Sequence, residues 1–120
     1  MKKMCFLIAV AALAQDHGPP PGMRCVPRTI VTYNFVESDK LAQFRPQHMA
    51  YILSLLKSGK LLMAGPMETG QTVTGVFATS NWADIESMMK DEPFTREGLL
   101  KVASHEVWNA CEFDSSQAAK

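Results

Sequence analysis

The sequence lacks the patterns that mark several common protein classes. Its 12 basic and 12 acidic residues are scattered and balance to a formal charge of zero, whereas a nucleic-acid-binding domain carries a basic stripe. It has no glycine-rich phosphate loop, and no cluster of His, Cys and acidic residues at metal-ligand spacing. We therefore expect no nucleic-acid partner, no metal and no cofactor.

Long hydrophobic runs are also scarce, and the clearest one stands at the start of the chain. Two lysines precede the apolar run Met4–Leu13, which ends in the small-residue cleavage pattern Ala12-Leu13-Ala14. This is the pattern of a secretory signal peptide over residues 1–14, and the run is too short for a transmembrane helix. We expect a periplasmic or secreted protein with no membrane partner after cleavage. The alternatives are a buried N-terminal strand or a membrane-anchoring helix.

Cysteine is rare, and removal of the signal peptide makes the count even. Of three cysteines, one lies in residues 1–14, which leaves Cys25 and Cys111. Two cysteines in an oxidising compartment are candidates for a disulfide. Cleavage also removes two lysines and no acidic residue, so the formal charge falls from 0 to −2.

The remaining chain has the composition of one folded domain with polar ends. Residues 15–27 are polar and rich in proline, which predicts an extended leader outside the core. Residues 28–112 carry the hydrophobic periodicity, and their number suits a single compact domain. Residues 113–120 are polar and predict a flexible tail.

Periodicity within the domain predicts four strands and two helices. β-branched and aromatic residues at short spacing predict strands over 29–36, 60–67, 72–79 and 100–111. Apolar residues at helical spacing predict helices over 45–58 and 82–91. In the first helix, Pro46 suits the opening turn. Its core stripe is expected to be Met49, Ile52, Leu53 and Leu56.

The order β-α-β-β-α-β predicts an α+β fold, the ferredoxin-like plait, with one antiparallel sheet and two helices on one face. The first strand is apolar on both sides, so we expect the open face to pack against a second copy, with Phe35 or Phe77 at the interface. In this plait the first and last strands are antiparallel neighbours. Cys25 precedes the first strand and Cys111 ends the last, which favours a bridge between them.

Three short stretches predict a small polar pocket. His48 lies one turn into the first helix, Gly65 and Pro66 form a tight turn after the second strand, and Asp91-Glu92 precede a proline. An imidazole oriented by a carboxylate can take and give a proton near neutral pH. The alternative is that His48 is an ordinary surface residue of the helix and that the Gly-Pro pair only ends a strand.

Arg45 precedes His48 by three residues, and its planar guanidinium is suited to holding a substrate carboxylate. The alternative is a surface ion pair with Glu37 or Asp39.

With this order of elements, three motifs resemble the YCII-related (YciI-like) family of small dimeric α/β-barrel proteins. They are Arg45-Pro46-x-His48-x-x-Tyr51, the stretch 59–66 (GKLLMAGP), and Glu92-Pro93-Phe94 followed by Gly98. The resemblance covers roughly residues 29–108. It implies a homodimer and an active site built from a histidine and an aspartate. Glu92 stands where the family has the aspartate, with Asp91 beside it.

The resemblance implies a small-molecule ligand, since the wider superfamily includes lyases, isomerases and monooxygenases of ring-breakdown products. The expected function is that of an exported, cofactor-independent enzyme. Its His-carboxylate pair would act as general acid and base on a small organic acid or ring-derived substrate. The alternative is a non-catalytic ligand-binding or stress-associated dimer, which the change from aspartate to Glu92 favours.

Overall fold

The computed structural model describes residues 18–118, so the predicted signal peptide lies outside the described residues. Those residues form two compact units. The larger is Pro27–Ala110, and the smaller is made of residues 18–26 and 111–118. No helix in the described part of the chain is long and apolar enough to cross a membrane.

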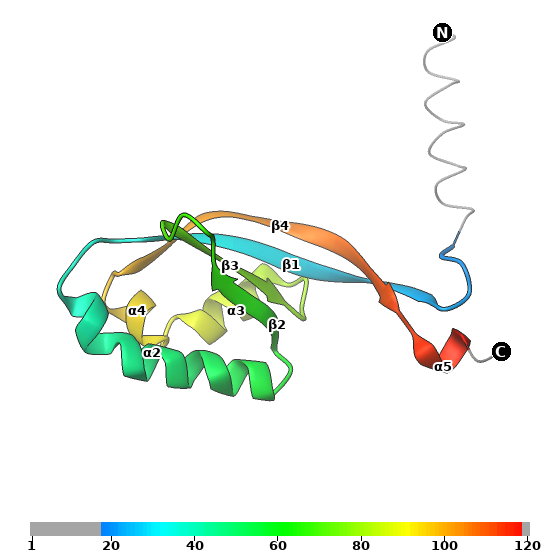
Figure 1. Ribbon diagram of the computed structural model, residues 1–120, viewed down its shortest axis with the longest axis horizontal. Coiled ribbons are helices and arrows are strands. Elements are labelled where there is room, and N and C mark those ends of the chain that lie inside the picture. Colours follow the sequence, from blue (N-terminus) through cyan, green and yellow to red (C-terminus); the bar gives the residue numbers. More distant parts are fainter. Residues whose placement is uncertain (1–17, 119–120) are drawn as a thin grey trace, which may run out of the picture. The chain divides into compact units, whose positions relative to one another are not determined.

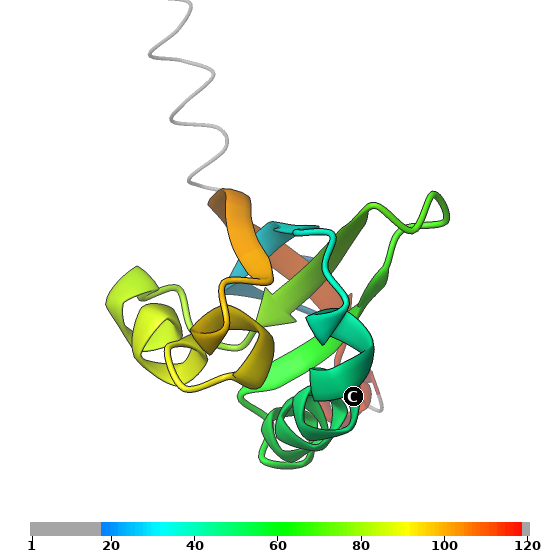
Figure 2. The same cartoon turned by 90° about the vertical axis from the view of Figure 1, so that its left-hand side faces the viewer.

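The four strands and the helices α2 and α3 follow the predicted order β-α-β-β-α-β, and the short helices α4 and α5 are additional (Figure 1). The strands form one sheet in the order β2-β3-β1-β4, and helices α2, α3 and α4 cover one side of it (Figure 2). This confirms the ferredoxin-like plait and the predicted neighbours of the first strand. The elements are β1 (Met23–Phe35), α2 (Lys40–Lys57), β2 (Leu61–Pro66), β3 (Thr72–Phe77), α3 (Trp82–Met89), α4 (Pro93–Arg96), β4 (Leu100–Phe113) and α5 (Ser115–Ala118).

Helix α2 begins five residues before the predicted start, so Pro46 lies inside it rather than in its first turn. Leu41 and Phe44 already pack against the core. The Ser38 hydroxyl accepts a hydrogen bond from the Lys40 amide at 3.1 Å. The packing of this extra turn outweighs the hydrogen bond that an internal proline removes.

The core stripe of α2 is rotated from the predicted one. Leu55 is buried and Ile52 packs against the core, but Met49 and Leu53 are 54% and 49% exposed. Successive helical residues are turned by about 100°, so a core stripe through Leu41, Phe44 and Leu55 leaves Leu53 on the outer side. Met49 lies at the edge of that stripe, where it lines the cavity described below. The predicted core positions of Met49 and Leu53 are therefore wrong.

The end of α2 follows the predicted glycine cap. Gly59 has a φ of +77°, and the amides of Gly59 and Lys60 donate to the carbonyls of Leu56 and Leu55 at 3.2 and 3.1 Å. This is a Schellman ending, in which glycine takes the left-handed position without steric cost. It turns the chain directly into β2, which forms one wall of the site described below.

The core lies between the helices and the sheet. Its most deeply buried apolar side chains come from β1, β2, β3, α3 and α4, and each stabilises the fold by about 1.5–3 kcal/mol. They are Val31, Leu61, Phe77, Ile85 and Phe94.

Phe35 and Phe77 were predicted at a dimer interface on the open face, and this is wrong. Phe77 is 1% exposed inside the core, and Phe35 meets Phe94 edge-on at 6.3 Å between ring centroids. Exposed apolar side chains are found elsewhere on the edge strands: Leu62 and Met63 on β2, and Val102, Val107 and Trp108 on β4. The homodimer itself stays a prediction.

The second predicted helix ends two residues early, and an unpredicted short helix follows it. Helix α3 is capped by Asn81, whose side chain accepts the Asp84 amide at 3.3 Å, and it ends at Met89. The short helix α4 then occupies what was predicted to be a connection, with Glu92 as its N-cap. An acidic residue before proline is a favoured helix start, because the carboxylate accepts a free amide and proline needs none.

The smaller unit is held by side-chain links between its two chain segments. Cys25 and Cys111 are joined by a disulfide, and Arg24 pairs with Glu112 at 2.8 Å. Strand β1 begins at Met23, within the stretch predicted as an extended leader, because these residues have partners from the far end of the chain.

Candidate functional site

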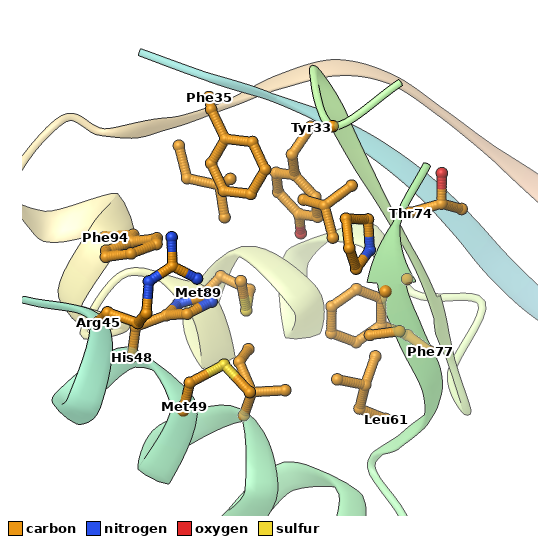
Figure 3. A pocket seen from close by; sticks show the side chains of 18 residues that line it. Tyr33, Phe35, Arg45, His48, Met49, Leu61, Thr74, Phe77, Met89 and Phe94 are labelled. Carbon is orange, nitrogen blue, oxygen red and sulfur yellow. The ribbon is translucent and has the colours of Figure 1, made fainter. Parts of the chain in front are cut away.

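A cavity of about 290 Å³ lies between α2 and the sheet (Figure 3). Most of its lining is apolar, as in small-molecule sites in general. These apolar side chains include Phe35, Met49, Ile52, Leu61, Val73, Phe77, Met89, Phe94 and Leu100. Four side chains with polar groups, those of Tyr33, Arg45, His48 and Thr74, also line it.

His48 has Glu92 directly behind it. Nδ1 of His48 contacts Oε1 of Glu92, which is completely buried, while the His48 side chain is 13% exposed. The second carboxylate oxygen, Oε2, accepts the Thr95 amide at 2.7 Å. A buried carboxylate is costly unless it is paired and hydrogen-bonded, and both of its oxygens are engaged here.

These contacts set the charge of Glu92. Burial alone would raise the pKa of its carboxyl group, but the hydrogen bonds from His48 and the Thr95 amide, together with the charge of His48, outweigh burial and lower the pKa. Glu92 is therefore an anion at neutral pH. The contact with the carboxylate places an imidazole proton on Nδ1, which makes Nε2 the nitrogen available to a ligand.

The imidazole is also held from one face. The rings of His48 and Phe94 are stacked, with centroids 3.9 Å apart and planes 6° from parallel. Phe94 is 1% exposed and belongs to α4, the helix that Glu92 caps. Helix α4 thus supplies the ring that stacks on His48, and its N-cap residue, Glu92, supplies the carboxylate.

The structure brings most of the predicted site residues to one place. Arg45, Gly65 and Pro66 line the same cavity as His48, and Arg45 has an exposed side chain. Among the described residues Arg45 has no ion-pair partner, so the alternative pairing with Glu37 or Asp39 is not observed.

Asp91, the second predicted carboxylate, does not join the site. It is exposed and does not line the cavity, because the chain turns at Glu92 to start α4. The described residues also contain no group of three His, Cys, Asp or Glu side chains placed to hold a metal ion.

Tyr51 and His105 have other roles. The Tyr51 hydroxyl donates to the Met88 carbonyl and links α2 to α3. His105 stacks on Trp82, with ring centroids 3.7 Å apart, and does not line the cavity.

Sequence reasoning missed Tyr33. Its side chain is 5% exposed and lines the cavity from β1, and its hydroxyl has no hydrogen-bond partner among the described residues. The only signal was the alternation of β1, which puts a phenol between Val31 and Phe35 on the inner side of the strand.

Comparison with known sequences gives one family and no curated relative. The model of the YCII-related domain family matches residues 27–109, and no curated protein matches the chain. Among solved structures, the chain is similar to 5-chloro-2-hydroxyhydroquinone dehydrochlorinase from Burkholderia phenoliruptrix AC1100, in complex with 2,5-dihydroxybenzoquinone. The identity is 22% and the TM-score 0.45, over 68% of this chain and 92% of the other.

Proposed function

The chain belongs to the YCII-related domain family, and on that premise we propose that it is an enzyme that acts without a cofactor. His48 is its general acid and base, Glu92 orients His48, and the substrate is a small organic acid or ring-derived compound. The observation that carries the proposal is the buried Glu92 carboxylate in contact with Nδ1 of a histidine that lines an apolar cavity.

The proposed chemistry is proton transfer through Nε2 of His48. As a base, Nε2 takes a proton from a carbon or oxygen of the substrate, and the imidazolium that forms is stabilised by the adjacent Glu92 carboxylate. As an acid, Nε2 returns the proton to another position of the substrate or to a leaving group. The apolar lining keeps bulk water from competing for that proton.

Arg45 gives the proposed site its preference for acids. Its guanidinium lines the cavity and has no anionic partner among the described residues. A planar guanidinium binds a carboxylate through two parallel hydrogen bonds. We therefore propose that Arg45 binds the substrate carboxylate and that His48 contacts the reacting atoms.

The contact of Glu92 with His48 supports the enzyme over a non-catalytic binding protein. That alternative was favoured by the change from aspartate to the longer glutamate. Glu92 nevertheless contacts Nδ1 while it caps α4, so its extra methylene does not separate the pair.

Export is part of the proposal. The signal-like residues 1–14 predict it, and the Cys25–Cys111 disulfide supports it, because such bonds persist in oxidising compartments.

The test is a thermal-shift screen of residues 15–120 against small carboxylates and ring-derived acids, followed by a search for turnover of each compound that binds. His48→Gln and Glu92→Gln should each lower kcat by about 100-fold or more. Asp91→Asn is the matched control, since it removes a neighbouring carboxylate outside the cavity. Turnover that survives His48→Gln would rule out this mechanism, and ligands that bind without turnover would favour the non-catalytic alternative.

A further inference from the structure

The Tyr33 hydroxyl is a buried polar group without a partner. Its side chain is 5% exposed, and its oxygen makes no hydrogen bond to any described residue. Figure 3 shows the ring extending from β1 with its oxygen pointing into the cavity that His48 lines. Buried hydroxyl groups are nearly always hydrogen-bonded in folded proteins. This one is therefore placed to bond a group that the described residues do not supply.

The electrostatics of the cavity indicate which group this is. Burial, and then the nearby charge of Glu92, raise the pKa of the Tyr33 phenol, so it keeps its proton and can donate it in a hydrogen bond. The same negative charge disfavours an anionic oxygen beside Tyr33. The cationic side chain of Arg45, which comes from α2 and not from β1, favours an anion at its own part of the cavity.

We propose that Tyr33 is a ligand-positioning residue that donates a hydrogen bond to a neutral carbonyl oxygen. The ligand class is then a flat, mostly apolar carboxylic acid with a separate carbonyl group. Its carboxylate lies at Arg45, its carbonyl at Tyr33, and its ring against the apolar lining of the cavity. This rests on the proposed function only in taking the same cavity as the ligand site.

A pair of isosteric probes tests the assignment. 4-Acetylbenzoate carries a carboxylate and a carbonyl at opposite ends of a ring, and 4-isopropenylbenzoate has nearly the same shape, with a methylene group in place of the carbonyl oxygen. Calorimetric titration of wild-type residues 15–120 should show about five- to tenfold tighter binding of 4-acetylbenzoate, the value of one hydrogen bond between neutral groups. Tyr33→Phe should remove this preference.

The stability of the unliganded variant is a second readout. Replacing an unpartnered buried hydroxyl by hydrogen removes a desolvated group and leaves the ring in place. Tyr33→Phe should therefore melt at the same temperature as the wild type or above it. Tyr51→Phe is the matched control for binding, because it makes the same change at a phenol that donates to the Met88 carbonyl and does not line the His48 cavity. It should leave the probe preference unchanged.

Each contrary result overturns the assignment. The assignment is wrong if the wild type binds the two probes equally, or binds neither at millimolar concentration. It is also wrong if the preference survives in Tyr33→Phe. The measurement is an equilibrium and needs no turnover, so its failure would leave the proton-transfer role of His48 standing. Conversely, an inactive protein that still prefers 4-acetylbenzoate would retain the Tyr33 assignment and lose only the proposed reaction.

Discussion

Glu92 lies completely buried behind His48, and one of its carboxylate oxygens contacts Nδ1 of the imidazole. The two residues are 44 positions apart in the sequence and come from different helices. Because the other carboxylate oxygen caps α4, one side chain both starts a helix and orients the candidate catalytic base.

Glu92→Gln should destabilise the protein at neutral pH by about 1–3 kcal/mol, because an amide replaces a charged acceptor in a buried site. The folded-state pKa of Glu92 is lowered from its ordinary value of 4.5. Its stabilising contribution is therefore fully present above pH 4.5 and is lost as the pH falls through the lower, folded-state pKa. The difference in unfolding free energy between wild type and variant should shrink below pH 4.5. Urea unfolding between pH 7 and pH 3 measures this difference. A difference that grows on acidification would contradict the prediction.

His48→Ala should abolish ligand binding or activity and leave a folded domain. Replacing an exposed helical residue would lower the unfolding free energy by only about 0.5 kcal/mol. His48, however, is stacked on Phe94 and only 13% exposed. We therefore expect a loss of about 1–2 kcal/mol. Circular dichroism and thermal melting check the fold, and calorimetry checks the binding. His105→Ala is the control, because its imidazole lies outside the cavity.

The Cys25–Cys111 disulfide should be present in protein purified from the periplasm or medium. Thiol titration of the unfolded, unreduced protein should find no free thiols, and two per chain would exclude the bridge. The bridge spans 86 positions, for which the chain-entropy treatment gives about 4–5 kcal/mol. Replacing both cysteines by serine should lower the unfolding free energy by up to that amount.

The domain should form a homodimer at micromolar concentration. Exposed Val107 and Trp108 on β4 are 57% and 47% accessible, and apolar side chains exposed on one strand favour a protein partner. Light scattering should give twice the chain mass, and Trp108→Lys should shift it towards the monomer. A wild-type monomer at this concentration would remove the argument.

The exported protein should begin at Gln15. The small residues Ala12 and Ala14 precede a polar residue, as at signal-peptidase sites. Intact-mass spectrometry of protein from an exporting host measures the N-terminus directly. A chain that retains Met1 after export would contradict cleavage.

The order of the elements could be predicted because each depends on residues close together in the sequence. Alternation in the strands, helical spacing and the Gly59 cap are all local signals. The start of α2 was misplaced because Pro46 is a local signal too, and the packing of Leu41 and Phe44 against distant residues outweighs it. Contacts of that kind are invisible in a single sequence.

The site was predictable in composition but not in geometry. His48, Arg45, Gly65 and Pro66 were found from motifs, and they line one cavity. The predicted turn at Gly65 and Pro66 is wrong, because both residues lie in strand β2 and pair with β3. The choice between Asp91 and Glu92 depends on which residue caps α4, and α4 itself was not predicted. Tyr33 matters because its hydroxyl has no hydrogen-bond partner among the described residues. Only the folded structure shows this.

Gly75 leaves space beside the cavity that a side chain would occupy. It lines the cavity from β3, and a Cβ added there would stand 3.3 Å from Cδ1 of Leu61 and 3.6 Å from Cε2 of Phe77. The cavity wall at Gly75 is therefore backbone without a side chain, and a methyl group there would press against Leu61. A Gly75→Ala substitution would therefore narrow the cavity beside Leu61 without altering His48 or Glu92.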